Sequence, residues 1–156
     1  MTVWGRLFVV EADDLEPFDV DAFFMDELPR PTREYGGIGV APGQFWYRTK
    51  APIRAEGQTI VFRLEGNLIA SAVLLKRARA HSVRDAAQIA NGFMGWLLLD
   101  VHTLRWAGAA RVTKAELKNH SARGDAIATQ RSQLKLTDEE DAWIQTRINQ
   151  WQLVQP

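Results

Sequence analysis

Aromatic residues occupy positions 45–47, and an arginine, a threonine and a lysine follow directly at positions 48–50 (FWYRTK). The flat face of an aromatic side chain stacks on an unpaired base, which contributes about 1–3 kcal/mol per base. Because alternate residues of a strand face opposite sides, at least one of the three aromatic residues is expected in the core. The run is a candidate for base stacking beside positive charge, and the alternative is that its aromatic residues only complete the core.

A second run, KRARAHSVR, covers Lys76–Arg84 and holds four positive side chains and a histidine. Such side chains are the usual partners of nucleic-acid phosphates, although the run is equally typical of a solvated strand end. The phosphate interpretation would gain support if Arg48, Lys50 and Arg54 lay beside this run in the fold.

The residues that could carry catalysis are few. Three histidines, His81, His102 and His120, are scattered without metal-ligand spacing, and the chain has no cysteine. The segment NHSARGD contains a histidine, a serine and an aspartate, but it is better interpreted as a polar turn than as a catalytic triad. We therefore expect binding rather than catalysis, with no cofactor and no metal.

Length and composition predict one domain over residues 1–156, of the ordinary soluble kind, since 46% of the residues are hydrophobic and 24% are charged. No signal peptide and no membrane span is apparent, so a cytoplasmic location without membrane contact is expected. The net charge is zero, yet acidic residues outnumber basic ones nine to three in residues 1–45, whereas basic residues lead fifteen to six in residues 46–135. Either one face is basic, which suits a phosphate backbone, or the segments interleave and cancel.

The elements that must position these residues are mostly short strands. Alternating or continuous apolar patterns predict strands over residues 3–10, 44–50, 59–64, 68–79, 93–101 and 103–108. The triplet Glu65-Gly66-Asn67 predicts a tight turn between two of them, in which Gly and Asn adopt positive φ. Asp19 is a candidate cap for a short helix, and residues 30–43, rich in glycine and proline, predict a long loop. Thr113 and Thr137, each followed three residues later by glutamate, open two helices, and the second carries the apolar stripe Ile144, Ile148 and Trp151.

Three small residues, Ala70-Ser71-Ala72, interrupt the longest predicted strand, where bulky residues would be expected. Alternation places the two alanines on one face and Ser71 on the other. Small side chains allow sharp curvature or close helix packing, and they can also line a hollow that holds a ligand.

The order of these motifs resembles the PUA-like β-barrels, in the branch that holds the EVE, YTH and ASCH domains. The hairpin EGQTIVFRLEGNLIASAVLLKR resembles their central hairpin, WGRLFVVEADD resembles their opening strand, and QLKLTDEEDAWIQTRI resembles their closing helix. FMGWLLLDVHTLRWAGAARVTKAELKN resembles the later strand pair and the helix start after it. The sequence departs from the subfamily signatures, because the ASCH motif GxKxxExR and the Trp-Ser-Thr stretch of YTH readers are not visible.

The resemblance implies an α+β fold, a small curved barrel of antiparallel or mixed strands, with short peripheral helices and a C-terminal helix. It also implies binding of RNA or DNA, with one base, modified or not, held in an aromatic-lined pocket at the barrel mouth. By this analogy the base-binding residues are Trp46, Tyr47, Thr49 and Ser71. The basic residues assigned to phosphates are Arg48, Lys50, Arg54, Lys76, Arg77 and Arg79.

Two alternatives stay open. One is an ASCH-like amidohydrolase acting on a modified nucleoside, for which Lys50, Thr49 and Glu65 are the nearest candidates for the family's Lys, Thr and Glu. The other is a protein-interaction module whose acidic N-terminal segment docks a partner.

Overall fold

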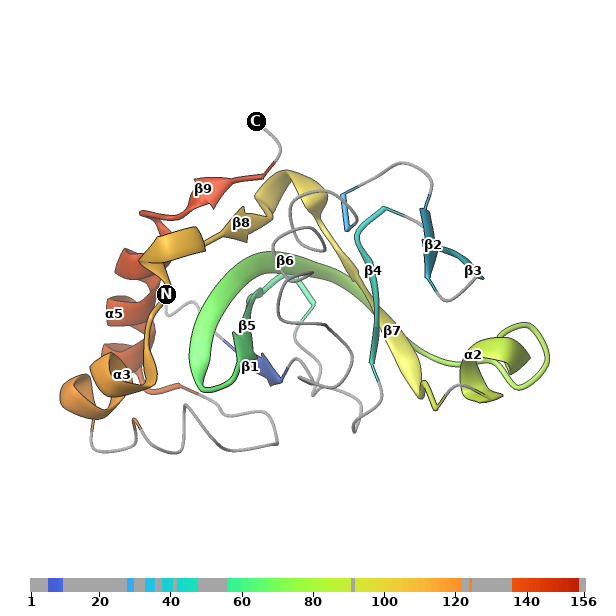
Figure 1. The fold of residues 1–156 in the computed structure, drawn as a ribbon, viewed down its shortest axis with the longest axis horizontal. Coiled ribbons are helices and arrows are strands. Elements are labelled where there is room, and N and C mark those ends of the chain that lie inside the picture. Colours follow the sequence, from blue (N-terminus) through green and yellow to red (C-terminus); the bar gives the residue numbers. More distant parts are fainter. Residues whose placement is uncertain are drawn as a thin grey trace.

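The computed structural model describes residues 6–9, 28–29, 33–35, 38–40, 42–47, 56–90, 92–121, 124 and 136–154. Seven strands of this part of the chain form one mixed sheet in which β1 (Arg6–Val9), β5 (Thr59–Leu64), β6 (Asn67–Arg79), β7 (Gly95–Leu99) and β4 (Gln44–Tyr47) are neighbours in that order (Figure 1). β1 runs parallel to β5, and the other pairings are antiparallel. Two short strands, β8 (Arg105–Trp106) and β9 (Gln152–Leu153), extend the sheet from β6.

The centre of the sheet is the β5–β6 hairpin, which closes through a two-residue turn. Leu64 pairs with Asn67, so the turn consists of Glu65 and Gly66, with φ of 54° and 84°. Positive φ at both turn residues matches the right-handed twist of the flanking strands. The predicted tight turn is confirmed, although Glu65 rather than Asn67 adopts the left-handed conformation.

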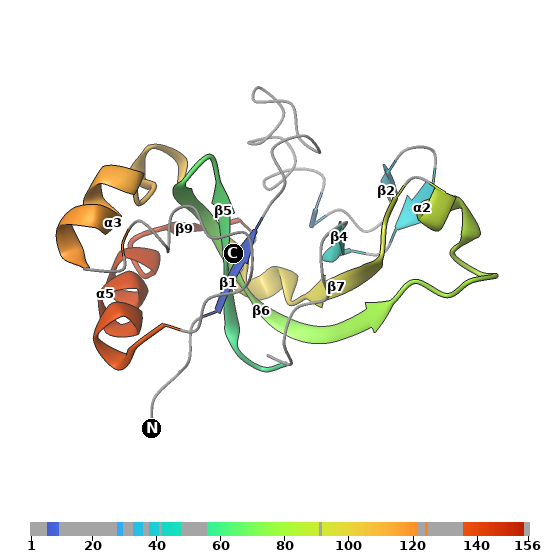
Figure 2. The ribbon, with the colours of Figure 1, turned by 90° about the horizontal axis from the view of Figure 1, so that it is seen from below.

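β6 has 13 residues and takes part in two halves of the sheet. Its first half pairs with β5 and β8, and its second half pairs with β7. The register shifts opposite Phe62/Arg63 and again between Leu74 and Lys76, and such bulges bend a strand and increase its twist. The far half of β6, together with β7, forms an arm that extends away from the helices α3 (Lys114–His120) and α5 (Asp138–Ile148). The short helix α2 (Ala86–Ala90) lies at the end of this arm (Figure 2). This β6–β7 arm consists of residues 75–99.

The α+β prediction is confirmed, and the sheet is curved and mixed as expected. Among the described strands, however, β1 and β4 stand at the two ends of the strand order and are not paired with each other. The sheet in this part of the chain is an open, barrel-like surface rather than a closed barrel. The bulges in β6 supply the curvature, and closure would need a pairing between its two ends.

The predicted loop over residues 30–43 is wrong in part. It contains β2 (Arg33–Tyr35) and β3 (Ile38–Val40), which pair antiparallel with Tyr35 opposite Ile38. The two residues between these strands are both glycine, a composition that favours a tight hairpin turn. The helix expected after Asp19 lies outside the described residues.

Two hydrophobic clusters lie on the opposite faces of the sheet. One contains Ile60 and Phe62 of β5 together with Ala70 and Ala72 of β6. The other joins Val61 of β5 to the helices α3 (Lys114–His120) and α5 (Asp138–Ile148) and includes Leu117, Ile144, Ile148 and Trp151. The alternation predicted for the hairpin is thus confirmed, and the predicted stripe of α5 is buried against the sheet.

Both helices begin as the sequence predicts. In each, the threonine hydroxyl accepts a hydrogen bond from the backbone N–H of the glutamate three residues on, and that glutamate side chain accepts one from the threonine N–H. This reciprocal pair satisfies backbone donors that would otherwise lack partners at a helix start. Within the residues described, no helix is long and apolar enough to cross a membrane.

Candidate functional site

Ser71 faces away from its two alanine neighbours. Ala70 and Ala72 are buried in the first hydrophobic cluster, whereas Ser71 stands opposite Val61 on the face that α5 covers. Ser71 is also opposite Arg105 of β8, so it has a neighbouring strand on each side. The small residues therefore serve two purposes, since the alanines fit a tight core and Ser71 opens a space on the other face.

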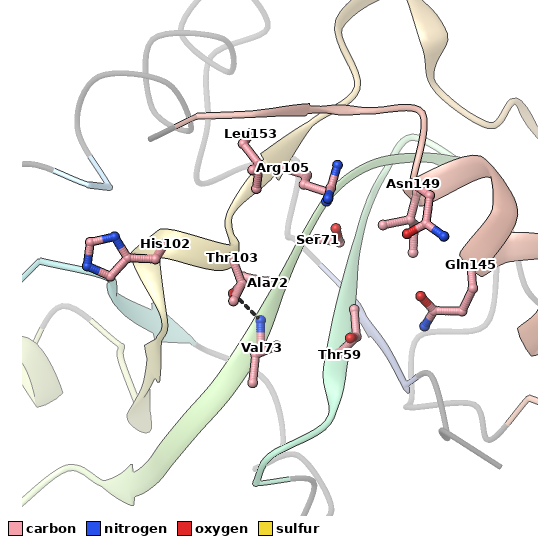
Figure 3. Close-up of a pocket in the computed structure, with 11 residues that line it drawn as sticks. Thr59, Ser71, Ala72, Val73, His102, Thr103, Arg105, Gln145, Asn149 and Leu153 are labelled. Atoms are coloured by element: carbon pink, nitrogen blue, oxygen red, sulfur yellow. Dashed lines mark hydrogen bonds between the residues drawn. The ribbon is translucent and has the colours of Figure 1, made fainter. Parts of the chain in front are cut away.

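That space is a pocket of about 330 Å³ between β6, β8, β9 and the last turn of α5, here called the β6–α5 pocket (Figure 3). In Figure 3 the side-chain ends of Ser71, Arg105, Gln145 and Asn149 surround a common space, and His102 lies apart from them. The described residues that line the pocket are Thr59, Ser71, Ala72, Val73, His102, Thr103, Arg105, Gln145, Ile148, Asn149 and Leu153. None of these is acidic, and most of the polar ones can donate hydrogen bonds.

Hydrogen bonds fix two walls of the β6–α5 pocket. The hydroxyl of Thr103, in the 3-10 helix η3 (Val101–Thr103), accepts from the N–H of Val73 at 2.8 Å and donates to the carbonyl of Asp100 at 2.7 Å. The guanidinium of Arg105 donates through Nη1 to the carbonyl of Trp151 at 2.7 Å, which ties β8 to the chain after α5. The walls are therefore held in place by backbone groups.

Gln145 carries an unsatisfied donor at the pocket. Its side-chain nitrogen Nε2 is buried, and among the described residues no acceptor lies within hydrogen-bonding distance of it. A buried polar atom without a partner is destabilising and is rare in folded proteins. This amide is thus an unsatisfied donor in the wall of the pocket.

The β6–β7 arm brings the second set of predicted residues together. Arg79 is opposite Gly95, which is opposite Tyr47, while Ala78 is opposite Trp96, which is opposite Trp46. The Nζ atom of Lys76 lies 5.8 Å from the centre of the Trp96 ring, a cation–π distance. Positive charge and aromatic residues are thus gathered at one end of the sheet.

The loop at the end of this arm is ordered by its own hydrogen bonds. The carboxylate of Asp85 accepts from the His81 N–H at 2.7 Å and from the Arg84 guanidinium at 3.1 Å. The bond from Arg84, followed by that from the His81 backbone, holds the pKa of Asp85 below its ordinary value. Arg84 is therefore paired with a carboxylate within the protein.

The predicted site residues do not form a single cluster. Ser71 belongs to the β6–α5 pocket, whereas Trp46 is in register with Trp96 and Ala78, roughly 20 Å further along β6 at about 3.3 Å per residue. Lys76 and Arg79 are exposed and Arg77 is half-buried, all on the arm. Arg48, Thr49, Lys50 and Arg54 lie outside the described residues.

The residues considered for catalysis have other surroundings. His120 stacks on Trp143 with 3.9 Å between ring centres, and the Ser121 hydroxyl donates to Glu140 at 2.7 Å, so both connect the end of α3 to α5. Glu65 is exposed at the hairpin turn. Among the described residues no three His, Asp or Glu side chains gather as metal ligands would.

The sequence interpretation missed most of the pocket. Arg105 stands between two buried residues, Leu104 and Trp106, so alternation alone directs it to the face opposite to theirs. Gln145 directly follows Ile144, at the edge of the apolar stripe of α5. These two positions relative to buried residues were the only indications that Arg105 and Gln145 face the pocket. Nothing in the sequence indicated that β8 and α5 would lie beside Ser71.

Comparison with known proteins gives a match in structure only. No protein-family model matches the sequence. Among curated proteins there is no significant match either. Two crystal structures of the ASCH protein of Zymomonas mobilis are similar to this chain, one of a tyrosine-to-phenylalanine mutant and one titled simply ASCH.

The mutant structure superposes with a TM-score of 0.55 at 13% sequence identity and covers 95% of this chain and 99% of its own. The other gives 0.54 at 13% identity, with 95% and 96% covered. An identity this low is informative about the fold and not about the site residues. The resemblance of the sequence to the branch that holds ASCH domains is thus confirmed at the level of the fold.

Proposed function

We propose that the chain binds nucleic acid, RNA or DNA, at the end of the sheet where β4, β7 and the far half of β6 meet. The observation that carries this proposal is the register that aligns Tyr47, Gly95 and Arg79 in one row and Trp46, Trp96 and Ala78 in the next. Neighbouring strands are about 4.8 Å apart, so positions 47 and 79 are about 10 Å apart. Residues opposite each other share a face of the sheet, so position 79 accompanies position 47, whereas position 76 is on the face of positions 46 and 96. A base stacked on either aromatic residue therefore has a basic residue on its own face, and a strand that crosses this end of the sheet can contact both.

In this proposal Trp46 or Tyr47 stacks on one base, modified or not, and Thr49 contacts its edge. The phosphates are held by Lys76, Arg77 and Arg79 of the arm, together with Arg48, Lys50 and Arg54. The ASCH-type fold supports this assignment, because the PUA-like resemblance implies nucleic-acid binding. Ser71, which the sequence grouped with these residues, lines the β6–α5 pocket instead.

The test is a salt titration of binding to a single-stranded oligonucleotide. Each phosphate contact with a single strand contributes about 0.7 to the slope of log K against log salt concentration. The double variant Lys76→Gln, Arg79→Gln should therefore lower the slope by about 1.4. The matched control Lys114→Gln, Lys118→Gln removes the same charge from exposed positions of α3 and should leave the slope unchanged.

A stacking variant separates bases from phosphates. Trp46→Ala should weaken binding by about 1–3 kcal/mol without a change in slope, because stacking releases no counterions. If the double variants of the arm and of α3 lowered the salt slope equally, the proposed binding surface would be wrong. Absence of binding at low salt would contradict nucleic-acid binding altogether.

A further inference from the structure

We infer that the β6–α5 pocket is a second, separate binding site, and that it takes a small organic monocarboxylate. Its volume of about 330 Å³ falls at the lower end of the range typical of small-molecule sites, about 300–1,000 Å³. None of the described residues that line this pocket belongs to the surface proposed for nucleic acid.

The polar part of the pocket is built to donate hydrogen bonds. Gln145 offers a buried N–H₂ group without an acceptor among the described residues, and Ser71 and Thr59 add hydroxyls from two paired strands. A guanidinium has five N–H donors, and the bond from Arg105 to the Trp151 carbonyl uses only one of its nitrogens. Donors of these kinds converging on one space match a carboxylate, which accepts only.

The charge of the pocket selects a monoanion over a dianion. Arg105 contributes a full positive charge. The last turn of α5 lines the opposite wall, and the C-terminal end of a helix carries about half a negative charge. The net positive charge that remains is enough to stabilise one carboxylate. It does not offset the larger free-energy cost of removing a phosphate dianion from water.

The rest of the lining suits a compact apolar body. Val73, Ile148 and Leu153 line the same pocket as the donors, and Ile148 is almost fully buried. Side chains of this kind bind the hydrocarbon part of a ligand while the few polar groups fix its orientation. A small acid with a branched or aromatic body therefore satisfies both sides of the pocket.

The test uses benzoate, benzamide and inorganic phosphate at equal ionic strength with the full chain, followed by NMR through the backbone amide signals of Val73 and Arg105, which line the pocket. Benzoate should give saturable shifts with a Kd of about 1 mM or below. Benzamide, which keeps the shape and loses the charge, should bind at least about tenfold more weakly. Equal binding of benzoate and benzamide, or tighter binding of phosphate, would overturn the assignment.

A matched pair of variants locates the site. Gln145→Glu places a carboxylate where the free amide stands and should weaken benzoate binding by at least about tenfold. Because this amide nitrogen has no partner in the described structure, the substitution breaks no hydrogen bond that it makes, and the thermal midpoint checks that the variant folds. Gln150→Glu adds the same charge at an exposed position that does not line the pocket and should leave affinity within about twofold. Similar affinities for the two variants would show that the pocket does not bind the carboxylate.

Discussion

At the scale of single residues, Ala70 and Ser71 are adjacent and small for different reasons. Ala70 is fully buried between Phe62 of β5 and Trp106 of β8, so its volume is fixed by the core. Ser71 is also almost fully buried, but it stands on the other face, where it lines the wall of the β6–α5 pocket. Replacing each of the two residues with valine tests these two explanations.

We expect Ser71→Val to change the free energy of unfolding by less than about 1 kcal/mol and to abolish benzoate binding, because the added methyl groups enter the pocket. Ala70→Val adds bulk to a filled core and should cost about 1–3 kcal/mol. Urea unfolding measures both changes. A large loss of stability in Ser71→Val alone would show that the space in front of Ser71 is too small for a ligand.

The sequence predicted the face of the strand on which each of these residues lies, but not the residues that each of them contacts. Alternation in β6 depends only on neighbouring residues, so Ala70 and Ser71 could be assigned to opposite faces. The same holds for the two capping boxes, because each involves a threonine and a glutamate three positions apart. The pocket needs Ser71, Arg105 and Gln145, which come from three separate segments, and their meeting depends on tertiary packing that no local pattern encodes.

At the scale of elements, α3 and α5 are joined by a charged pair on the sheet face that they cover. The guanidinium of Arg147 in α5 donates to the carboxylate of Glu116 in α3, which is also the glutamate of the α3 capping box. The bond from Arg147 and that from the Thr113 N–H hold the pKa of Glu116 below its ordinary value of 4.5. The two helices are therefore held together most strongly when this carboxyl is ionised.

This pair predicts a loss of stability in acid. Since the pKa of Glu116 is lower in the folded protein, the unfolded chain takes up its proton first as the pH falls, and the stabilisation disappears between pH 4.5 and the lower, folded pKa. Urea midpoints of the wild type and Glu116→Gln should differ at pH 6 and converge near pH 3. Glutamine preserves the capping box, so the comparison isolates the charge. A difference that stays constant with pH would contradict this explanation.

At the scale of the whole molecule, the two proposed sites lie at different ends of β6. The first half of β6 lies near α5 and its second half extends toward α2 (Figures 1 and 2). The pocket is lined by residues of the first half, and the aromatic and basic residues are in register with the second half. A bulge between Leu74 and Lys76 separates the two halves. Sites this far apart with no shared residues usually behave independently.

Saturating benzoate should therefore change the oligonucleotide Kd by less than about twofold, and Gln145→Glu should leave the salt slope unchanged. The reciprocal measurement is the benzoate Kd of the Lys76→Gln, Arg79→Gln variant, which should equal that of the wild type. A mutual change of tenfold or more would mean that β6 transmits binding energy from one half to the other, since such coupling is reciprocal.

The mixed order of the sheet also has a consequence for how the chain folds. The β5–β6 hairpin closes through two residues, whereas β1 reaches its parallel partner β5 only after a long stretch of intervening chain. Closing the longer loop costs more entropy, and contacts between distant parts of a chain form slowly. Assembly is therefore expected to start from the β5–β6 hairpin, with β1 joining its edge afterwards, so that β1 would be synthesised before the hairpin and placed after it.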